Sequence, residues 1–158
     1  MLQVGQPAPE FELPDADMEM VSLAEFRNRK NVVVYFYPHD GTPSVTMEST
    51  DFSDHYDDFE RHHTEVLGVS MDDVLRHSEF RDQYGFAVRL LSDADGTVCG
   101  SYGVLREREQ DGVRTPSVQR ATFLIDKRGR IAQAWYSVKP RGHAAEVLET
   151  IRSTPQCK

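Results

Sequence analysis

Two continuous apolar segments in the first half of the chain predict buried strands. Residues 31–37 and 64–70 are rich in β-branched and aromatic side chains and lack the alternation of a half-exposed strand. The segment between them, 44–62, predicts a helix, because its apolar residues recur near one face. These residues are Val45, Phe52, Tyr56 and Phe59. We therefore expect two parallel strands joined by a right-handed helical crossover.

Helix and strand signals continue beyond this unit. Residues 72–84 predict a helix, and Gly85 directly after it is expected to form the C-cap. A short strand is expected over 89–92. A turn at 93–96 then leads into a short helix that contains Cys99.

The last third of the chain predicts a hairpin and a closing helix. The polar residues 106–116, which include a glycine, are interpreted as a loop. Strands over 120–126 and 130–136 are joined by Lys-Arg-Gly at 127–129, which indicates a tight hairpin. Apolar residues of 142–152 recur at i, i+3, i+4 and i+7, so this helix is expected to pack on the sheet.

These elements describe an α/β protein with a thioredoxin-like fold, in which helices flank a central mixed sheet. Two N-terminal segments, 11–14 and 21–26, are expected to add a strand and a turn. A chain of 158 residues with a hydrophobic fraction of 39% can bury one continuous core. We therefore expect a single domain over 1–158.

Charge and hydropathy narrow the classes of function. The net charge is −8 and no run of Lys or Arg exceeds two residues, so nucleic acid and anionic membranes are not expected as partners. The longest apolar run, 32–37, is too short to span a bilayer. Residues 1–9 lack the basic and apolar regions of a secretory signal, which favours a cytoplasmic location.

The two cysteines, Cys99 and Cys157, fit neither a zinc-ligand spacing nor a Cys-x-x-Cys motif. Cys99 is interpreted as a small buried side chain. The alternative is a reactive thiol, which requires exposure and a low pKa. Cys157 is next to last in the chain and is expected to lie in a mobile tail.

Acidic and histidine side chains between residues 51 and 63 raise the question of a metal site. His55 and His62 are seven residues apart, whereas a zinc-binding helix uses a closer pair at i and i+4. We interpret this segment as a solvated acidic helix face, and we expect no metal and no cofactor. His39 and Asp40, after the first buried strand, are also expected to face solvent.

The chain as a whole resembles the peroxiredoxins of the AhpC/TSA type, most closely the bacterioferritin comigratory (peroxiredoxin Q) group. Five segments in the family's order carry the resemblance: 4–14, 34–43, 90–96, 102–104 and 120–126. The resemblance implies a thioredoxin-like fold with the peroxiredoxin N-terminal extension. It also implies a thiol-dependent peroxidase, reduced by a thioredoxin-like protein, that is a monomer or weak homodimer.

The family's active-site motif departs from its pattern in this chain. Pro-x-x-x-Thr-x-x-Cys falls on Pro38, Thr42 and Val45, the family's arginine falls on Arg120, and a resolving position falls on Thr50. In the family a thiolate attacks the peroxide, while the Thr hydroxyl, helix N–H groups and the Arg hold the peroxide oxygens. Valine has no lone pair and no ionisable group, so ordinary turnover is not expected here.

Two hypotheses follow from this resemblance. In the first, the protein is catalytically degenerate, and Thr42 and Arg120 form a residual polar pocket for a small peroxide, oxyanion or carboxylate in a binding or regulatory role. In the second, it is a thioredoxin-dependent peroxidase of hydrogen peroxide and alkyl hydroperoxides, through Cys99 or as a Cys-substituted form of an active parent. Thr42 is also explained as the N-cap before Pro43, and Arg120 as an ordinary ion pair.

Overall fold

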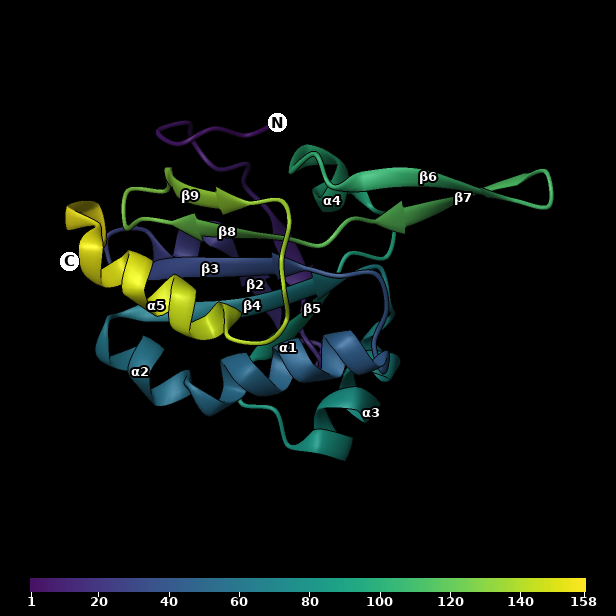
Figure 1. The fold of residues 1–158 in the computed structure, drawn as a ribbon, viewed down its shortest axis with the longest axis horizontal. Coiled ribbons are helices and arrows are strands. Elements are labelled where there is room, and N and C mark those ends of the chain that lie inside the picture. The colour runs from purple at the N-terminus through teal and green to yellow at the C-terminus, as the bar shows by residue number, and fades with distance from the viewer.

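The computed structural model describes residues 1–158 and is built on a five-stranded sheet in the order β5-β4-β3-β8-β9 (Figure 1). Its strands are β3 (Asn31–Phe36), β4 (Thr64–Ser70), β5 (Arg89–Ser92), β8 (Ala121–Ile125) and β9 (Ile131–Trp135). β3 and β5 are parallel to β4, whereas β8 is antiparallel to both β3 and β9. This mixed sheet confirms the α/β, thioredoxin-like topology expected from the sequence.

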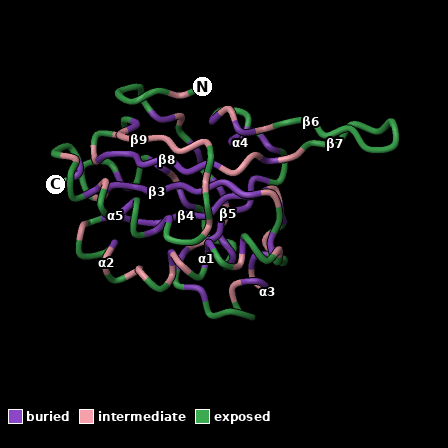
Figure 2. The backbone as a smooth tube through the Cα atoms, viewed as in Figure 1, coloured by how far each residue is buried: buried purple, intermediate pink, exposed green.

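Helices and N-terminal segments cover the two faces of the sheet. The helices are α1 (Pro43–Asp54), α2 (Tyr56–Arg61), α3 (Val74–Tyr84), α4 (Thr97–Ser101) and α5 (His143–Ser153). Val33 and Tyr35 of β3 pack in one hydrophobic cluster with α1 and α5, and Val34 and Phe36 pack in the other with α4. β3 is therefore buried on both faces (Figure 2), which explains why its sequence shows no alternation. No helix has both the length and the hydropathy to cross a membrane.

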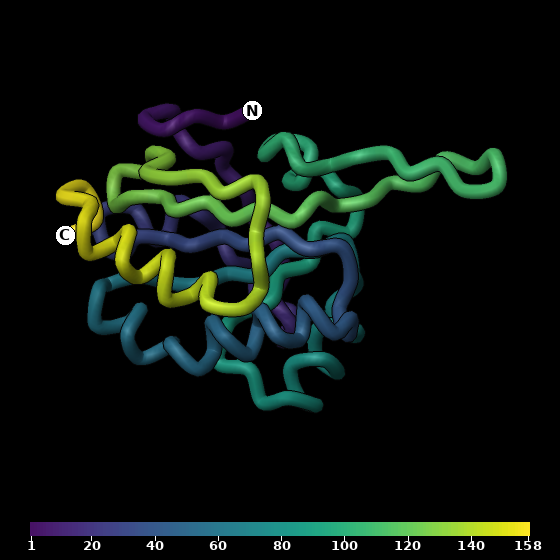
Figure 3. Tube along the Cα trace, in the orientation of Figure 1, coloured from purple at the N-terminus to yellow at the C-terminus, as the bar shows by residue number.

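The N-terminal segment forms the expected additional strand and turn (Figure 3). Its elements are β1 (Glu12–Pro14), β2 (Met20–Ser22) and a 3-10 turn over Leu23–Phe26. β1 and β2 pair as a small antiparallel sheet. Isolated bridges join Pro7 to Arg130 and Asp15 to Leu91. Because Arg130 directly precedes β9 and Leu91 lies in β5, this segment is attached to both edges of the sheet.

The single helix expected over 44–62 is wrong, because the structure has two helices, α1 and α2, that meet at His55. The backbone of His55 leaves helical geometry, with φ −99° and ψ 10°. Its ring Nδ1 donates to the carbonyl of Asp51 at 2.9 Å, while its own backbone N–H reaches the same carbonyl at 3.3 Å. The Asp51 carbonyl therefore accepts two hydrogen bonds from His55 at the residue where the helix breaks.

The loop expected over 106–116 is also wrong. The residues form a hairpin of β6 (Leu105–Gln110) and β7 (Val113–Val118) that projects away from the sheet (Figure 1). Asp111 and Gly112 turn the chain with φ of 55° and 78°, the signs that a two-residue hairpin turn requires. Most residues of the two strands are exposed, so backbone pairing holds a hairpin that no apolar pattern predicts.

Gly68 in β4 leaves room for the ring of Tyr35 on the neighbouring strand. A Cβ at this position would lie 2.6 Å from Tyr35 Cζ and 2.7 Å from its oxygen. Tyr35 is fully buried and stacks on Phe52 with ring centroids 4.7 Å apart, so it has little freedom to move. We expect Gly68→Ala to lower the free energy of unfolding by about 2 kcal/mol, measured by urea denaturation.

A matched control for this substitution is Gly100→Ala in α4. Its Cβ would meet only a Leu105 methyl at 4.0 Å, which is ordinary contact. Because alanine is favoured over glycine in a helix, this control should not destabilise the protein. Equal loss of stability in both variants would contradict the steric argument.

Candidate functional site

The start of α1 is a capped helix N-terminus. Thr42 has extended backbone geometry, and its Oγ1 accepts a hydrogen bond from the N–H of Val45 at 3.4 Å. Pro43 occupies the first helical position, where a missing N–H costs nothing. Thr46 Oγ1 donates to the Thr42 carbonyl at 2.9 Å and tightens the same turn. The capping role expected of Thr42 is present in the structure.

The sheet brings Arg120 to this helix start from the other half of the chain. Phe36 at the end of β3 pairs with Ala121 at the start of β8, so the residue before Ala121 lies beside the loop that follows β3. Arg120 Nη2 donates to Ser44 Oγ at 3.0 Å, and Nη1 lies 3.9 Å from Glu48 Oε2. Thr42 and Arg120 thus belong to one local arrangement, with Ser44 between them.

Glu48, which belongs to no motif recognised in the sequence, is the buried acid of this arrangement. Its side chain is 2% exposed and its Oε1 has no hydrogen-bonding partner, nor does Nη1 of Arg120. Burial raises the pKa of the Glu48 carboxyl to about 7, against the lowering effect of Arg120. The one sequence feature that places Glu48 near this site is its spacing. It follows Ser44 and Val45 by four and three residues, about one helical turn, and therefore lies on the same side of the helix.

The remaining motif positions have different surroundings. Val45 is fully buried and packs in the cluster beneath α1. Pro38 is half-buried, and Thr50 is exposed further along the helix. Hydrogen-bond donors therefore gather at the helix start, around Ser44 and Arg120, but no thiol stands among them.

Neither cysteine is placed as a reactive thiol. Cys99 is fully buried, and burial together with a hydrogen bond to Asp93 raises its pKa far above the ordinary value. Its backbone N–H donates to Asp93 Oδ2 at 2.7 Å. Its burial agrees with the packing role expected of it.

The expected mobile tail at Cys157 is wrong. Cys157 is 2% exposed, and its carbonyl accepts a hydrogen bond from Asn31 Nδ2 at 2.8 Å, which fastens the chain end to β3. Burial raises the pKa of this thiol to about 11. Cys99 and Cys157 lie in the two different hydrophobic clusters and are not bonded to each other.

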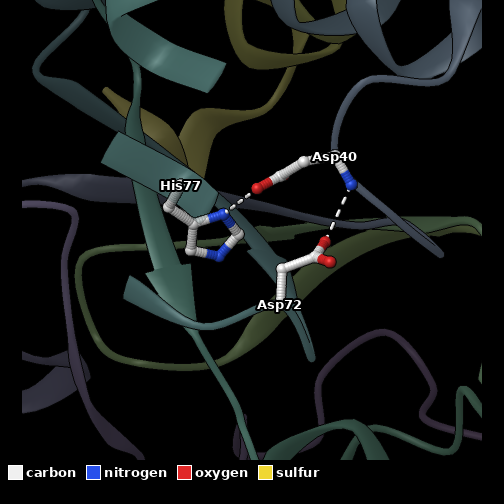
Figure 4. Close-up of side chains that lie close together, drawn as sticks. All are labelled: Asp40, Asp72 and His77. Atoms are coloured by element: carbon white, nitrogen blue, oxygen red, sulfur yellow. Dashed lines mark hydrogen bonds and ion pairs between the residues drawn. The ribbon is translucent and has the colours of Figure 1, made fainter. Parts of the chain in front are cut away.

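The loop before Thr42 is anchored by a buried carboxylate, which corrects the expectation that Asp40 faces solvent (Figure 4). Tyr37 donates its hydroxyl to Asp40 Oδ1 at 2.7 Å, and His77 Nδ1 lies 2.6 Å from Asp40 Oδ2. His77 Nε2 donates to the carbonyl of Leu91 at 2.8 Å. His39, by contrast, is exposed as expected. No sequence pattern links Asp40 to His77, because the two lie 37 residues apart.

Asp72 completes this network. Its Oδ2 accepts hydrogen bonds from the N–H of Asp40 at 2.8 Å and from Ser70 Oγ at 2.7 Å. Asp40, Asp72 and His77 offer ligand atoms within 4.8 Å of one another, the only such grouping in the molecule. Each of the three side chains is already engaged in short hydrogen bonds within the protein. The network therefore anchors the loop that contains Asp40 to the rest of the protein.

The acidic and histidine residues of 51–63 do not converge as metal ligands. One of them has a structural role instead. Asp51 Oδ2 accepts a hydrogen bond from the N–H of Ala144 at 3.0 Å and so caps the first turn of α5.

The buried Glu48 predicts a specific dependence of stability on pH. Its folded pKa of about 7 exceeds the ordinary 4.5, so the native state retains a proton that the unfolded chain has already released. Stability linked to this group is therefore greatest below about pH 4.5 and falls by roughly 3 kcal/mol as the pH rises through about 7. Urea denaturation at several pH values should show that Glu48→Gln removes this fall.

The control is Glu149→Gln on the exposed side of α5, where the carboxyl is 71% exposed. This variant should keep the pH profile of the parent protein. If Glu48→Gln also kept it, Glu48 would not titrate as a buried acid.

Comparison with known proteins supplies the wider context. The AhpC/TSA family pattern matches residues 4–134. A bcp relative from Coxiella burnetii is 42% identical over 93% of this chain and 97% of its own length. Peroxiredoxin Bcp of Bacillus subtilis is 34% identical, with 96% of each chain covered. A solved structure of Xanthomonas campestris bacterioferritin comigratory protein is 32% identical, with a TM-score of 0.88 over 99% of this chain and 100% of that one.

Proposed function

This chain belongs to the AhpC/TSA family and to its Bcp/PrxQ peroxiredoxins. From that premise we propose that it has a binding or regulatory role and does not reduce peroxides. The observation that carries the proposal is Val45. A fully buried aliphatic side chain stands in the first turn of α1, where the family resemblance requires the attacking thiolate.

The two native thiols support the same proposal. Attack on an O–O bond needs a thiolate that the peroxide can reach. Cys99 and Cys157 are both buried, and burial raises the pKa of each thiol, so both remain protonated near neutral pH. Neither thiol has the low pKa and the exposure that a substitute nucleophile needs.

The polar groups at the start of α1 suggest what the site binds. Ser44 Oγ and Arg120 Nη2 form one hydrogen-bonded pair, and the buried Nη1 of Arg120, which lies 3.9 Å from Glu48 Oε2, has no hydrogen-bonding partner. The guanidinium and the positive end of the α1 dipole both favour an anion. The proposed ligand is a small oxyanion or carboxylate that meets Arg120 at this helix start.

A second candidate, supported by the relatives, is a thiol peroxidase. The solved Xanthomonas campestris relative was described for its alkyl peroxide reduction activity. For the present chain this function requires Cys99 as the attacking thiol and a thioredoxin-like protein as reductant. The burial of Cys99 weighs against it.

One experiment separates the two candidates. The native protein is treated with hydrogen peroxide or an alkyl hydroperoxide, and intact mass reports whether either cysteine gains oxygen. A coupled assay with thioredoxin and its reductase reports turnover. The proposal expects neither oxidation nor turnover. Turnover that disappears in Cys99→Ser would overturn it.

A further inference from the structure

A cavity of about 870 Å³ lies between the β1–β2 hairpin and the N-terminal end of α3. We call it the acidic groove. Its apolar walls are formed by Leu13, Pro14 and Ala16 from the hairpin side and by Val74 and Leu75 from α3. None of the residues at the start of α1 lines it, so it is separate from the site proposed above. Its volume lies within the range of about 300–1,000 Å³ that is typical of ligand-binding clefts.

Two exposed apolar side chains stand on the lining of the acidic groove. Met18 is 77% exposed and Leu75 is 66% exposed. Single exposed apolar residues are common on protein surfaces, but here two of them border one concave apolar surface. The groove therefore offers apolar area both inside and at its rim.

The turn that presents Met18 is held in an uncommon conformation. Met18 has φ of 65°, in the left-handed region that costs a side-chain-bearing residue about 1 kcal/mol. Asp15 Oδ1 accepts hydrogen bonds from the N–H groups of Asp17 and Glu19, at 2.9 and 3.0 Å, and so stabilises the turn. A flexible thioether at such a position suits contact with surfaces of varied shape.

The charge along the acidic groove has one sign. Asp17, Asp73 and Asp95 are among its lining residues, which include no Lys, Arg or His. Only Asp17 is paired with a cation, since its Oδ1 lies 2.9 Å from Arg81 Nη1. The whole chain carries a net charge of −8. A fatty-acid anion and a second copy of this chain are both disfavoured by this charge.

We propose that the acidic groove is a docking site for a partner protein, entered by a segment that combines apolar and basic side chains. The apolar side chains pack between the β1–β2 hairpin and α3, and the basic ones meet Asp17, Asp73 and Asp95. All residues of this chain are placed in the structure, and none of its own segments fills the groove. The combination of apolar walls and carboxylates is what fits a partner segment with apolar and basic side chains.

The probe for this proposal is a short synthetic peptide of alternating Leu and Lys residues, titrated into the full protein while backbone amide chemical shifts are followed. The shifts should cluster around Met18, Leu75 and Asp95. A peptide with Glu in place of Lys should bind at least about tenfold more weakly, and raising the salt from about 50 to about 300 mM should weaken the Lys peptide.

Variants of the exposed residues test the groove without disturbing the core. Leu75→Ser and Asp17→Asn should each weaken the Lys peptide by about three- to tenfold. The matched control is Val113→Ser, a residue 60% exposed on the distant β6–β7 hairpin, which should leave binding unchanged.

Several results would overturn the proposal. Chemical shifts scattered over all acidic surfaces would show non-specific charge attraction. Equal binding by the Glu peptide, or displacement of the Lys peptide by decanoate, would show that the groove takes apolar compounds whatever their charge. Concentration-dependent shifts of the same residues without peptide would make a second copy of the chain the occupant.

Discussion

Replacing Val45 with cysteine is expected to create a peroxide-reactive thiol at the start of α1. The new side chain stands at a buried position in the first turn of α1, where burial raises the pKa of a thiol. Unlike Cys99, it lies beside Ser44, which Arg120 contacts, and both the dipole of α1 and this cation favour the thiolate. The Thr42 cap, Ser44 and Arg120 supply donors for the peroxide oxygens. We expect Val45→Cys to be oxidised roughly 10²–10³-fold faster than either native thiol, because each preorganised donor at such a site contributes on that scale.

The measurement is the rate of sulfenic acid formation, followed by intact mass and a dimedone-type probe. Cys99→Ser is introduced in both the parent and the Val45→Cys protein, so that any oxidation is assigned to position 45. Adding Arg120→Gln should remove most of the gain, since it deletes the nearby cation. A Val45→Cys thiol as inert as Cys99 would mean that the start of α1 does not hold a peroxide, and the proposed polar site would fail with it.

Replacing His77 with leucine is expected to cost about 3 kcal/mol or more of unfolding free energy. Because a carbonyl only accepts hydrogen bonds, His77 Nε2 carries the hydrogen that it donates to Leu91. The contact of 2.6 Å between Nδ1 and Asp40 Oδ2 holds a second hydrogen. The variant leaves the buried Asp40 carboxyl group and the Leu91 carbonyl without this hydrogen-bonding partner, and each buried polar group left unpaired costs its desolvation penalty.

Urea denaturation measures this cost, and His39→Leu is the matched control. His39 is 69% exposed and lies 3.7 Å from Asp72, so its loss should change stability by less than about 0.5 kcal/mol. A double-mutant cycle with Asp40→Asn should give a coupling energy of more than about 1 kcal/mol. Equal costs for His77→Leu and His39→Leu would contradict the assignment of a buried pair.

The strands and helices with strong apolar patterns could be predicted from local sequence. β3 and β4 are buried on both faces, so their apolar runs identify them directly. The hairpin of β6 and β7 could not be found this way. Its strands have almost no buried face, and only the Asp111–Gly112 turn signal marks them.

The candidate site was predictable in its residues but not in its surroundings. Thr42 and Pro43 predict a helix start from residue type alone, because Thr is favoured at the N-cap and Pro at the first helical position. The burial of Glu48 and the contact of Arg120 with Ser44 depend on the pairing of β8 with β3. Arg120 and Ser44 are 76 residues apart in the sequence. The burial of Asp40 depends in the same way on α3, which brings His77 to it.

The chemistry available at the helix start follows from residue identity: position 45 carries no sulfur, and no arrangement in space can supply one. The reactivity of the two existing thiols follows from their environment. Cys157 is nearly the last residue and nevertheless lies in the core, because Asn31 of β3 binds its carbonyl. Burial and charge arise from contacts between distant segments, whereas the presence of a functional group is a property of each residue alone.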